Sequence, residues 1–195
     1  MSWIALEGGE GSGKSTQARL LADALGAVLT REPGATPVGG MIRDVLLDPR
    51  SQLGIRTEAL LLAADRAEHV GAVVSSALAA GHTVVSDRSA WSSLAYQGYG
   101  RGLSVDDLWR ISDWAMAGRW PDLAVLIDVP AEVANRRLAG RGPADRLELV
   151  GDGFHDRVRS GFLELAARWP EQWAVVDGTG SEEQVGARVR RAVRA

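Results

Sequence analysis

Residues 8–15 of the chain read Gly-Gly-Glu-Gly-Ser-Gly-Lys-Ser and follow the apolar run Trp-Ile-Ala-Leu at residues 3–6. They match the phosphate-binding pattern G-x-x-x-x-G-K-[ST] in the setting that this pattern requires, a strand, a loop and then a helix. Glycines let such a loop curl so that successive backbone N–H groups point at a phosphate, and the start of the following helix adds positive potential. The stretch therefore predicts a nucleoside triphosphate site.

The roles within this loop follow from its chemistry. Lys14 is expected to reach the β- and γ-phosphates, and the hydroxyl of Ser15 to ligate Mg²⁺. Lys14 is the only lysine among 22 basic residues, and the other 21 are arginine. This exception indicates that the loop needs a compact ammonium, which a planar guanidinium does not replace. A single lysine also excludes the usual guanine-reading Asn-Lys-x-Asp element. The predicted ATP-binding residues are Gly8, Gly9, Glu10, Gly11, Ser12, Gly13, Lys14, Ser15 and Thr16.

Composition narrows the classes of protein that remain. The chain has 195 residues, a formal net charge of −3 and no cysteine, which excludes zinc-ribbon, iron–sulfur and thiol-nucleophile chemistry. The absence of cysteine and of a leader segment favours a cytoplasmic location. No apolar run is long enough to span a membrane, and the acidic balance gives no general attraction to nucleic acids. We expect neither membranes nor nucleic acids as partners.

Short apolar runs alternate with segments of helical periodicity. Strands separated by helices imply right-handed crossovers and a parallel sheet. We therefore predict an α/β fold: one P-loop NTPase-type domain over residues 1–195, with a doubly wound, five-stranded parallel sheet and helices on both faces. The expected strands are residues 3–6, 27–30, 83–86, 123–127 and 173–176; the expected helices are residues 14–25, 38–47, 57–80, 89–97, 105–117, 131–139, 154–168 and 182–193.

Charged residues follow the second and third predicted strands, at the sheet edge where ligands bind in such folds. Asp87 ends the third strand and suits a second-sphere Mg²⁺ ligand, and Arg88 suits a bidentate grip on a phosphate; a structural ion pair is the alternative. Glu10 is unusual beside phosphates, so it is expected to bind a sugar hydroxyl or a metal-bound water, or else to be a solvated loop residue.

Four further motifs indicate a family. Thr-Arg-Glu-Pro-Gly-Ala-Thr stands at residues 30–36, Asp-Arg at 87–88 precedes Ser-Ser-Leu-Ala-Tyr-Gln-Gly at 92–98, Trp-Pro-Asp-Leu-Ala-Val-Leu-Ile-Asp-Val spans 120–129, and Asp-Arg-Leu-Glu spans 145–148. Together with the phosphate loop, from residue 3 to about 165, they resemble the bacterial thymidylate kinases. The resemblance implies the reaction ATP + dTMP → ADP + dTDP, a Mg²⁺ requirement, a nucleoside-monophosphate-kinase-like domain and a homodimer.

The same resemblance implies the substrate site. It places Glu10 and Glu32 near the sugar and phosphate of dTMP, and Arg43 and Arg88 on its phosphate. It assigns the thymine edge to Arg66, completed by Ser93 and Gln97, and the ribose 2′ position to Tyr96. The implied substrate-binding residues are Glu10, Glu32, Arg43, Leu62, Arg66, Arg88, Ser93, Tyr96 and Gln97; the implied metal residues are Ser15 and Asp87.

Residues 137–146 resemble the family's lid, which we expect at about 140–152. Phosphoryl transfer needs positive charge over the transferring group and exclusion of water, which an arginine-bearing loop supplies on closing. The phosphate loop carries no arginine, so the chain resembles the lid-arginine type, with Lys14, Arg88, Arg141 and Arg146 as catalytic residues. The alternative is a solvated basic loop.

The chain departs from the family pattern at two positions. Leu62 stands where a phenylalanine usually stacks on thymine, one helical turn before Arg66, and losing such stacking costs roughly 1 kcal/mol or more; Trp91 is the candidate to compensate. Ser89 stands where an aromatic residue is common. For the tryptophans at 109, 114 and 120, a place in the core is favoured over a dimer face.

Two other functions remain open from the residues alone. A kinase for a nucleoside or another monophosphate would use Glu10 or Glu32 as a base if the acceptor carried no phosphate. A nucleotide-binding switch would hydrolyse ATP without any acceptor.

Overall fold

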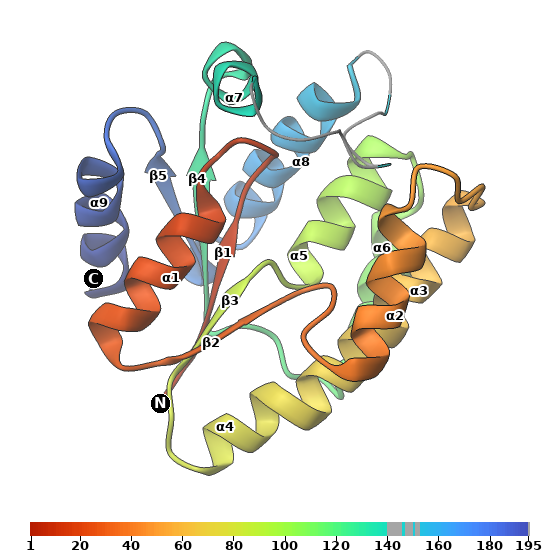
Figure 1. The fold of residues 1–195 in the computed structure, drawn as a ribbon, viewed down its shortest axis with the longest axis horizontal. Coiled ribbons are helices and arrows are strands. Elements are labelled where there is room, and N and C mark those ends of the chain that lie inside the picture. The colour runs from red at the N-terminus through yellow and green to blue at the C-terminus, as the bar shows by residue number, and fades with distance from the viewer. Residues whose placement is uncertain (140–145, 147–149, 151–152, 195) are drawn as a thin grey trace.

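The computed structural model describes residues 1–139, 146, 150 and 153–194, and its centre is a parallel sheet of five strands in the order β2-β3-β1-β4-β5 (Figure 1). The strands are β1 (Trp3–Glu7), β2 (Val28–Arg31), β3 (Val84–Asp87), β4 (Leu123–Asp128) and β5 (Trp173–Asp177). The predicted doubly wound α/β fold is confirmed, with each strand within a residue or two of its expected bounds.

Alternation along the central strands creates two cores, one on each face of the sheet. Ile4 and Leu6 of β1 pack with Val125 and Ile127 of β4 under α1 (Lys14–Leu25) and α9 (Glu182–Arg194). Ala124 and Leu126 point to the other face, toward the helices that follow β3 and toward α8 (Phe154–Arg168). Both faces are therefore covered, as Figure 1 shows.

The segment after β3 is helical as expected but changes its winding. It begins as α5 (Ala90–Ser93) and continues as a π-helix, η2 (Leu94–Gly100). Close packing against α8 accompanies this turn, since a Cβ on Gly161 would lie 2.5 Å from the ring of Tyr99. π-Helical turns often occur at functional sites because they change which side chains face inward, and η2 carries Tyr96 and Gln97.

The remaining helices surround this centre: α2 (Pro37–Leu47), α3 (Ile55–His69), the π-helix η1 (Val70–Val74), α4 (Ser75–Ala79), α6 (Val105–Ala115), α7 (Ala131–Leu138) and the 3₁₀ turn η3 (Pro170–Gln172). The single helix expected over residues 57–80 is therefore two α-helices joined by a π-helical turn. No helix in the described part of the chain is both long enough and apolar enough to cross a membrane.

The tryptophans divide between the core and the surface. Trp91 is buried, with ring centroids 4.6 Å from Trp120 and 5.2 Å from Trp173. Trp114 is 84% exposed and Trp109 is 37% exposed, both on α6. The expectation that these tryptophans belong to the core is therefore wrong for Trp114, because its helix turns that side chain outward, and for Trp109, which is partly exposed where it stacks on Trp120.

Candidate functional site

The phosphate loop connects β1 to α1 and needs its glycines for two reasons. Gly8, Gly11 and Gly13 have φ values of 147°, 71° and 90°, a region that side chains other than glycine rarely adopt. In addition, a Cβ on Gly8 would lie 2.8 Å from the carbonyl oxygen of Ile127, and one on Gly11 would lie 2.6 Å from that of Ala134. The loop is thus fitted against β4 and α7.

Lys14 lies over this loop in a buried position. Its Nζ is 3.2 Å from the Gly9 carbonyl oxygen, to which it donates, and 3.8 Å from Oε2 of Glu10. Burial and the nearby Arg88 lower the pKa of Lys14, although Glu10 opposes this effect. The hydroxyl of Ser12, also buried, has no hydrogen-bond partner among the described residues. A phosphate in the loop would give both groups an acceptor.

A cavity of about 340 Å³ extends from the phosphate loop to α3, between the ends of β2 and β3. This volume is typical of a small-molecule site. All nine predicted substrate residues line it, together with Lys14, Ser15 and Asp87. The described residues that line it are Glu10, Lys14, Ser15, Arg31, Glu32, Pro33, Arg43, Leu46, Leu47, Glu58, Leu62, Arg66, Asp87, Arg88, Ser89, Ser92, Ser93, Tyr96 and Gln97.

Arg88 holds the end of the cavity nearest the phosphate loop. Its guanidinium donates to Oε1 of Glu10, to the Tyr96 hydroxyl at 2.8 Å and to the Ser92 hydroxyl at 3.0 Å. Burial alone would raise the pKa of Glu10, but the positive charges of Lys14 and Arg88 outweigh it and hold that pKa well below its usual range. Glu10 is therefore an ionised partner of both cations, and not a solvated loop residue.

Ser15 and Asp87 are the oxygen donors available for a divalent cation. Both line the cavity, and Oδ1 of Asp87 is buried without a hydrogen-bond partner among the described residues. No cluster of three or more acidic or histidine ligands occurs in the described part of the chain. A hydroxyl and one carboxylate fit Mg²⁺ that is held mainly by nucleotide phosphates and water.

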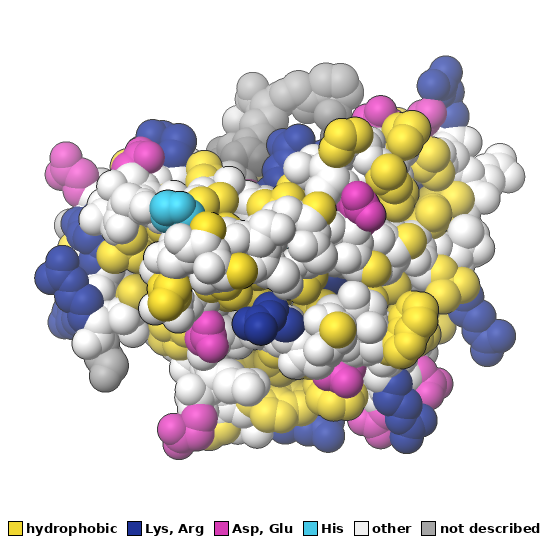
Figure 2. All heavy atoms as spheres, turned by 90° about the horizontal axis from the view of Figure 1, so that it is seen from below, with side chains coloured by type: hydrophobic (Ala, Val, Ile, Leu, Met, Phe, Trp, Pro, Cys, Tyr) yellow, Lys and Arg dark blue, Asp and Glu magenta, His cyan; other side chains and the backbone are white. Residues whose placement is uncertain are grey.

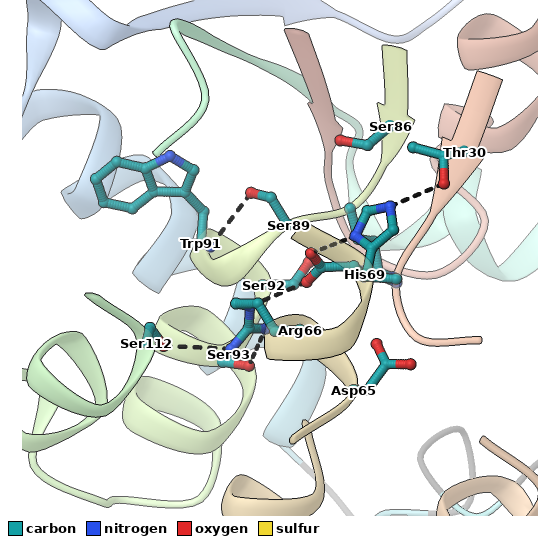
Figure 3. Close-up of polar contacts among 12 residues, drawn as sticks. Thr30, Asp65, Arg66, His69, Ser86, Ser89, Trp91, Ser92, Ser93 and Ser112 are labelled. Atoms are coloured by element: carbon teal, nitrogen blue, oxygen red, sulfur yellow. Dashed lines mark hydrogen bonds and ion pairs between the residues drawn. The ribbon is translucent and has the colours of Figure 1, made fainter. Parts of the chain in front are cut away.

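Arg66 is fixed at the other end of the cavity by a buried network (Figure 3). Its Nε donates to Oε2 of Glu32 at 3.0 Å, its Nη2 to Ser93 at 2.9 Å and its Nη1 to Ser112 at 3.3 Å. These three contacts leave two of the five guanidinium N–H groups for a ligand. Arg66 on α3 thus offers two N–H donors from a fixed guanidinium. Helical periodicity alone would have predicted a solvated Arg66.

Glu32 is itself held by a histidine that the sequence did not single out. Nδ1 of His69 lies 2.8 Å from Oε1 of Glu32, and its Nε2 lies 2.8 Å from the Thr30 hydroxyl. Although burial would raise the pKa of Glu32, Arg66 and His69 keep it below its usual value. Thr30 does not line the cavity, so this chain of contacts orients Glu32 and does not activate a nucleophile.

Two further polar residues in or beside the site were missed. Glu7, at the end of β1, accepts hydrogen bonds from Ser89 at 2.7 Å and Ser92 at 2.6 Å; this contact accounts for Ser89 in place of an aromatic ring. Glu58 accepts from Gln97 at 2.8 Å. Helical spacing could have revealed Glu58, because positions 58, 62 and 66 share one face of α3.

Three other predicted residues lie outside the cavity or outside the described part of the chain. Arg146 pairs with Glu58, Nη2 to Oε2 at 2.7 Å, and donates to the Leu46 carbonyl at 2.7 Å, so it contacts α2 and α3. Arg141 lies outside the described residues, as does most of the expected lid at about 140–152. Trp91 is buried in the core and does not line the cavity, so it does not compensate for Leu62.

Comparisons with known proteins agree on one family. The family model described as thymidylate kinase matches residues 6–189. A curated thymidylate kinase of Clavibacter sepedonicus is 47% identical, covering 96% of this chain and 92% of the relative. Another, from Halothermothrix orenii, is 42% identical over 98% of this chain and 96% of the relative. A crystal structure of thymidylate kinase from Ehrlichia chaffeensis superposes with a TM-score of 0.80 at 30% identity, covering 98% of each chain.

Proposed function

The chain belongs to the thymidylate kinase family of ATP-dependent nucleoside monophosphate kinases, and we propose that it transfers the γ-phosphoryl group of MgATP to dTMP through the residues of the cavity described above. One observation carries this assignment of the site. A single cavity joins the phosphate loop and Arg88 at one end to the buried donors of Arg66 at the other, as an acceptor with a phosphate and a hydrogen-bonding base requires.

The polarity of the cavity supports one orientation of dTMP. Its phosphate belongs beside Arg88, Arg43 and Lys14, since cations hold phosphate oxygens with charge-assisted hydrogen bonds. Its base belongs between Leu62, Arg66 and the polar groups of Ser93 and Gln97. The hydroxyl of Tyr96 is committed to Arg88 and Glu10. We assign its ring the role of crowding a ribose 2′-hydroxyl.

The chemistry requires positioning more than proton transfer. A phosphate dianion is already a competent nucleophile, so catalysis rests on alignment and on stabilising the charge that shifts between the two phosphates. Lys14 and Arg88 supply fixed positive charge where this shift occurs.

The low pKa values of Glu10 and Glu32 argue against the nucleoside-kinase alternative. A general base works best with a pKa near the operating pH. Both carboxylates are instead held by cations in their ionised, weakly basic form, which suits them to binding and not to deprotonating an unphosphorylated acceptor.

Mg²⁺ is part of this proposal. The hydroxyl of Ser15 and the unpartnered carboxylate oxygen of Asp87 would hold the ion, Asp87 directly or through a water. The bound ion would neutralise charge on the β- and γ-phosphates.

The ATP side and the lid complete the site. Arg137 on α7 donates to the Ser12 carbonyl at 3.0 Å and to the Gly178 carbonyl at 2.9 Å. It therefore links Gly178 to the phosphate loop, and we propose the next two residues, Thr179 and Gly180, as neighbours of the adenine. We keep Arg141 as the catalytic lid arginine, whereas Arg146, which is paired with Glu58 and with the Leu46 carbonyl, serves as a contact of α2 and α3. We regard residues 1–195 as one nucleoside-monophosphate-kinase-like domain, which a single continuous sheet supports.

We also propose a homodimer in a cytoplasmic setting. Apolar side chains on α2, α3 and α6 are exposed, among them Met41 at 62%, Leu60 at 58% and Trp114. Figure 2 shows apolar side chains gathered on its right-hand side, where Figure 1 places α2 and α3. A patch of this kind marks an interaction surface. A chain without cysteine is compatible with a reducing compartment.

A coupled ADP-release assay with MgATP tests this function. We expect strong preference for dTMP when dTMP, dUMP, dGMP and thymidine are offered separately. Phosphorylation of thymidine but not dTMP would favour a nucleoside kinase, and ADP release that is independent of any acceptor would favour an ATP-hydrolysing switch.

A further inference from the structure

We propose that Glu58 is a positioning residue for base selectivity: its carboxylate fixes the side-chain amide of Gln97 so that the site presents a hydrogen-bond acceptor to the base. The inference rests on the proposed function, because it concerns how the base of the acceptor is distinguished.

Glu58 and Gln97 come from different elements and meet in the wall of the cavity. Glu58 lies on α3 and Gln97 on η2, and each is 1% exposed. Nε2 of Gln97 donates to Oε1 of Glu58 at 2.8 Å. An ionised carboxylate can only accept hydrogen bonds, so the amide nitrogen must face Glu58 and the amide oxygen must face away.

The amide oxygen of Gln97 is left without a partner. Oε1 is buried and has no hydrogen-bond partner in the described part of the chain. A buried acceptor in this state is costly, so it points to a donor that arrives with the ligand. The N3–H of thymine or uracil is such a donor, whereas N3 of cytosine is an acceptor at the same ring position. The orientation of this one amide therefore favours thymine and uracil over cytosine.

Two arginines determine the roles of the two carboxylate oxygens of Glu58. Oε2 of Glu58 lies 3.1 Å from Nη2 of Arg101 and 2.7 Å from Nη2 of Arg146, while Nε of Arg101 makes a longer contact of 3.4 Å with Oε1. Burial would raise the pKa of Glu58, but the contacts with Gln97 and Arg101 hold it below its usual value, so the acceptor-only form persists. Arginine only donates, which means that the Oε2 position must always be occupied by an oxygen.

The substitution Glu58→Gln turns this arrangement into a test. The arginines would keep the new amide oxygen at the Oε2 position and leave its NH₂ at the Oε1 position, facing Gln97. Gln97 would then have to turn its own oxygen toward residue 58 and its NH₂ toward the base. The site would present a donor where the wild-type site presents an acceptor.

The experiment compares kcat/KM for dTMP, dUMP and dCMP in the wild type, E58Q, E58D, Q97A and the double variant E58Q/Q97A. We expect E58Q to raise the dCMP-to-dTMP ratio about tenfold or more, mainly through a higher KM for dTMP, because mispaired buried polar groups carry strong discrimination. The dUMP-to-dTMP ratio should not change, since both bases carry N3–H. E58D keeps an acceptor-only group and should retain the wild-type ratio.

The double variant separates positioning from a general structural role. If Glu58 acts through Gln97, E58Q should no longer change the dCMP-to-dTMP ratio in the Q97A background. R110A is the control: it removes an exposed arginine that pairs with Asp107 and is not among the partners of Glu58 or Gln97 in the described part of the chain, so the ratio should stay at the wild-type value.

Equal loss for all three acceptors in E58Q, or an unchanged shift in the Q97A background, would overturn the inference while leaving the proposed function intact. A wild-type enzyme that ignores dTMP would instead overturn the proposed function.

Discussion

Arg66 and Glu32 form a buried ion pair across the cavity wall, with Nε of the arginine 3.0 Å from Oε2 of the glutamate and both side chains almost inaccessible to solvent. The pair joins α3 to the loop after β2, and His69 holds the second oxygen of Glu32. Because these contacts fix the guanidinium of Arg66, its position cannot adjust to the ligand. The base must fit the donors as they stand, which is what a selective site needs.

Breaking this pair should cost stability as well as activity. Removing one partner of a buried pair leaves an uncompensated charge, so E32A should lower the free energy of unfolding by about 3–5 kcal/mol. The matched control is D107A, which removes the exposed pair between Asp107 and Arg110 and should change it by less than about 1 kcal/mol. Urea unfolding of the two variants measures the difference, and equal effects would contradict the buried character of the Arg66–Glu32 pair.

Lys14 should be indispensable for turnover but not for folding. K14A removes the ammonium that faces the transferring phosphates and should lower kcat by about a hundredfold or more, with the unfolding midpoint little changed. K14R retains a positive charge but replaces a compact donor by a planar one, so it should rescue little activity. A clean preparation of K14A with near-normal turnover would refute the role of Lys14.

Glu7 should make stability depend on pH in the neutral range. Its burial raises its pKa from 4.5 to about 7, although hydrogen bonds from Ser92 and Ser89 and the charge of Arg88 oppose the rise. Between these two pH values the folded state binds the proton more tightly than the unfolded state. The stability that protonated Glu7 contributes is therefore complete below pH 4.5 and is lost as pH rises to about 7.

The variant E7Q isolates this effect, because its amide resembles the protonated acid. Relative to wild type, E7Q should gain on the order of 2–3 kcal/mol in the free energy of unfolding as pH rises from 5 to 8. Unfolding curves at both pH values test this, and parallel pH profiles for the two proteins would show that Glu7 does not titrate in this range.

Leu62 offers a test of how the base is held. Tyr96 is the only aromatic residue among the described residues that line the cavity, and Leu62 stands one helical turn before Arg66. L62F should lower KM for dTMP about fivefold, since a stacked ring contributes roughly 1 kcal/mol or more. L62A should raise KM. A higher KM in L62F would show that the base does not lie against this side chain.

The fold and the phosphate end of the cavity could be predicted because they depend on local patterns, whereas the residues at the base end, Leu62, Arg66 and Gln97 among them, were implied by the family resemblance. Apolar runs and helical spacing defined the strands, and the edge of a parallel sheet brings the phosphate loop, Glu32 and Arg88 together without any further information. Glu7 and Glu58 were missed because their roles depend on partners from distant elements. The prediction for Trp114 was wrong for a related reason. Tryptophan is mostly buried on average, but the packing of α6 determines the direction in which this ring points.

Identification of the products tests the assignment most directly. Phosphorus NMR of the wild-type protein with MgATP and dTMP should show ADP and dTDP forming in equal amounts, with no build-up of inorganic phosphate. Formation of ADP with inorganic phosphate, or of dTMP from thymidine while added dTMP stays unchanged, would contradict transfer to the 5′-phosphate of dTMP in this cavity.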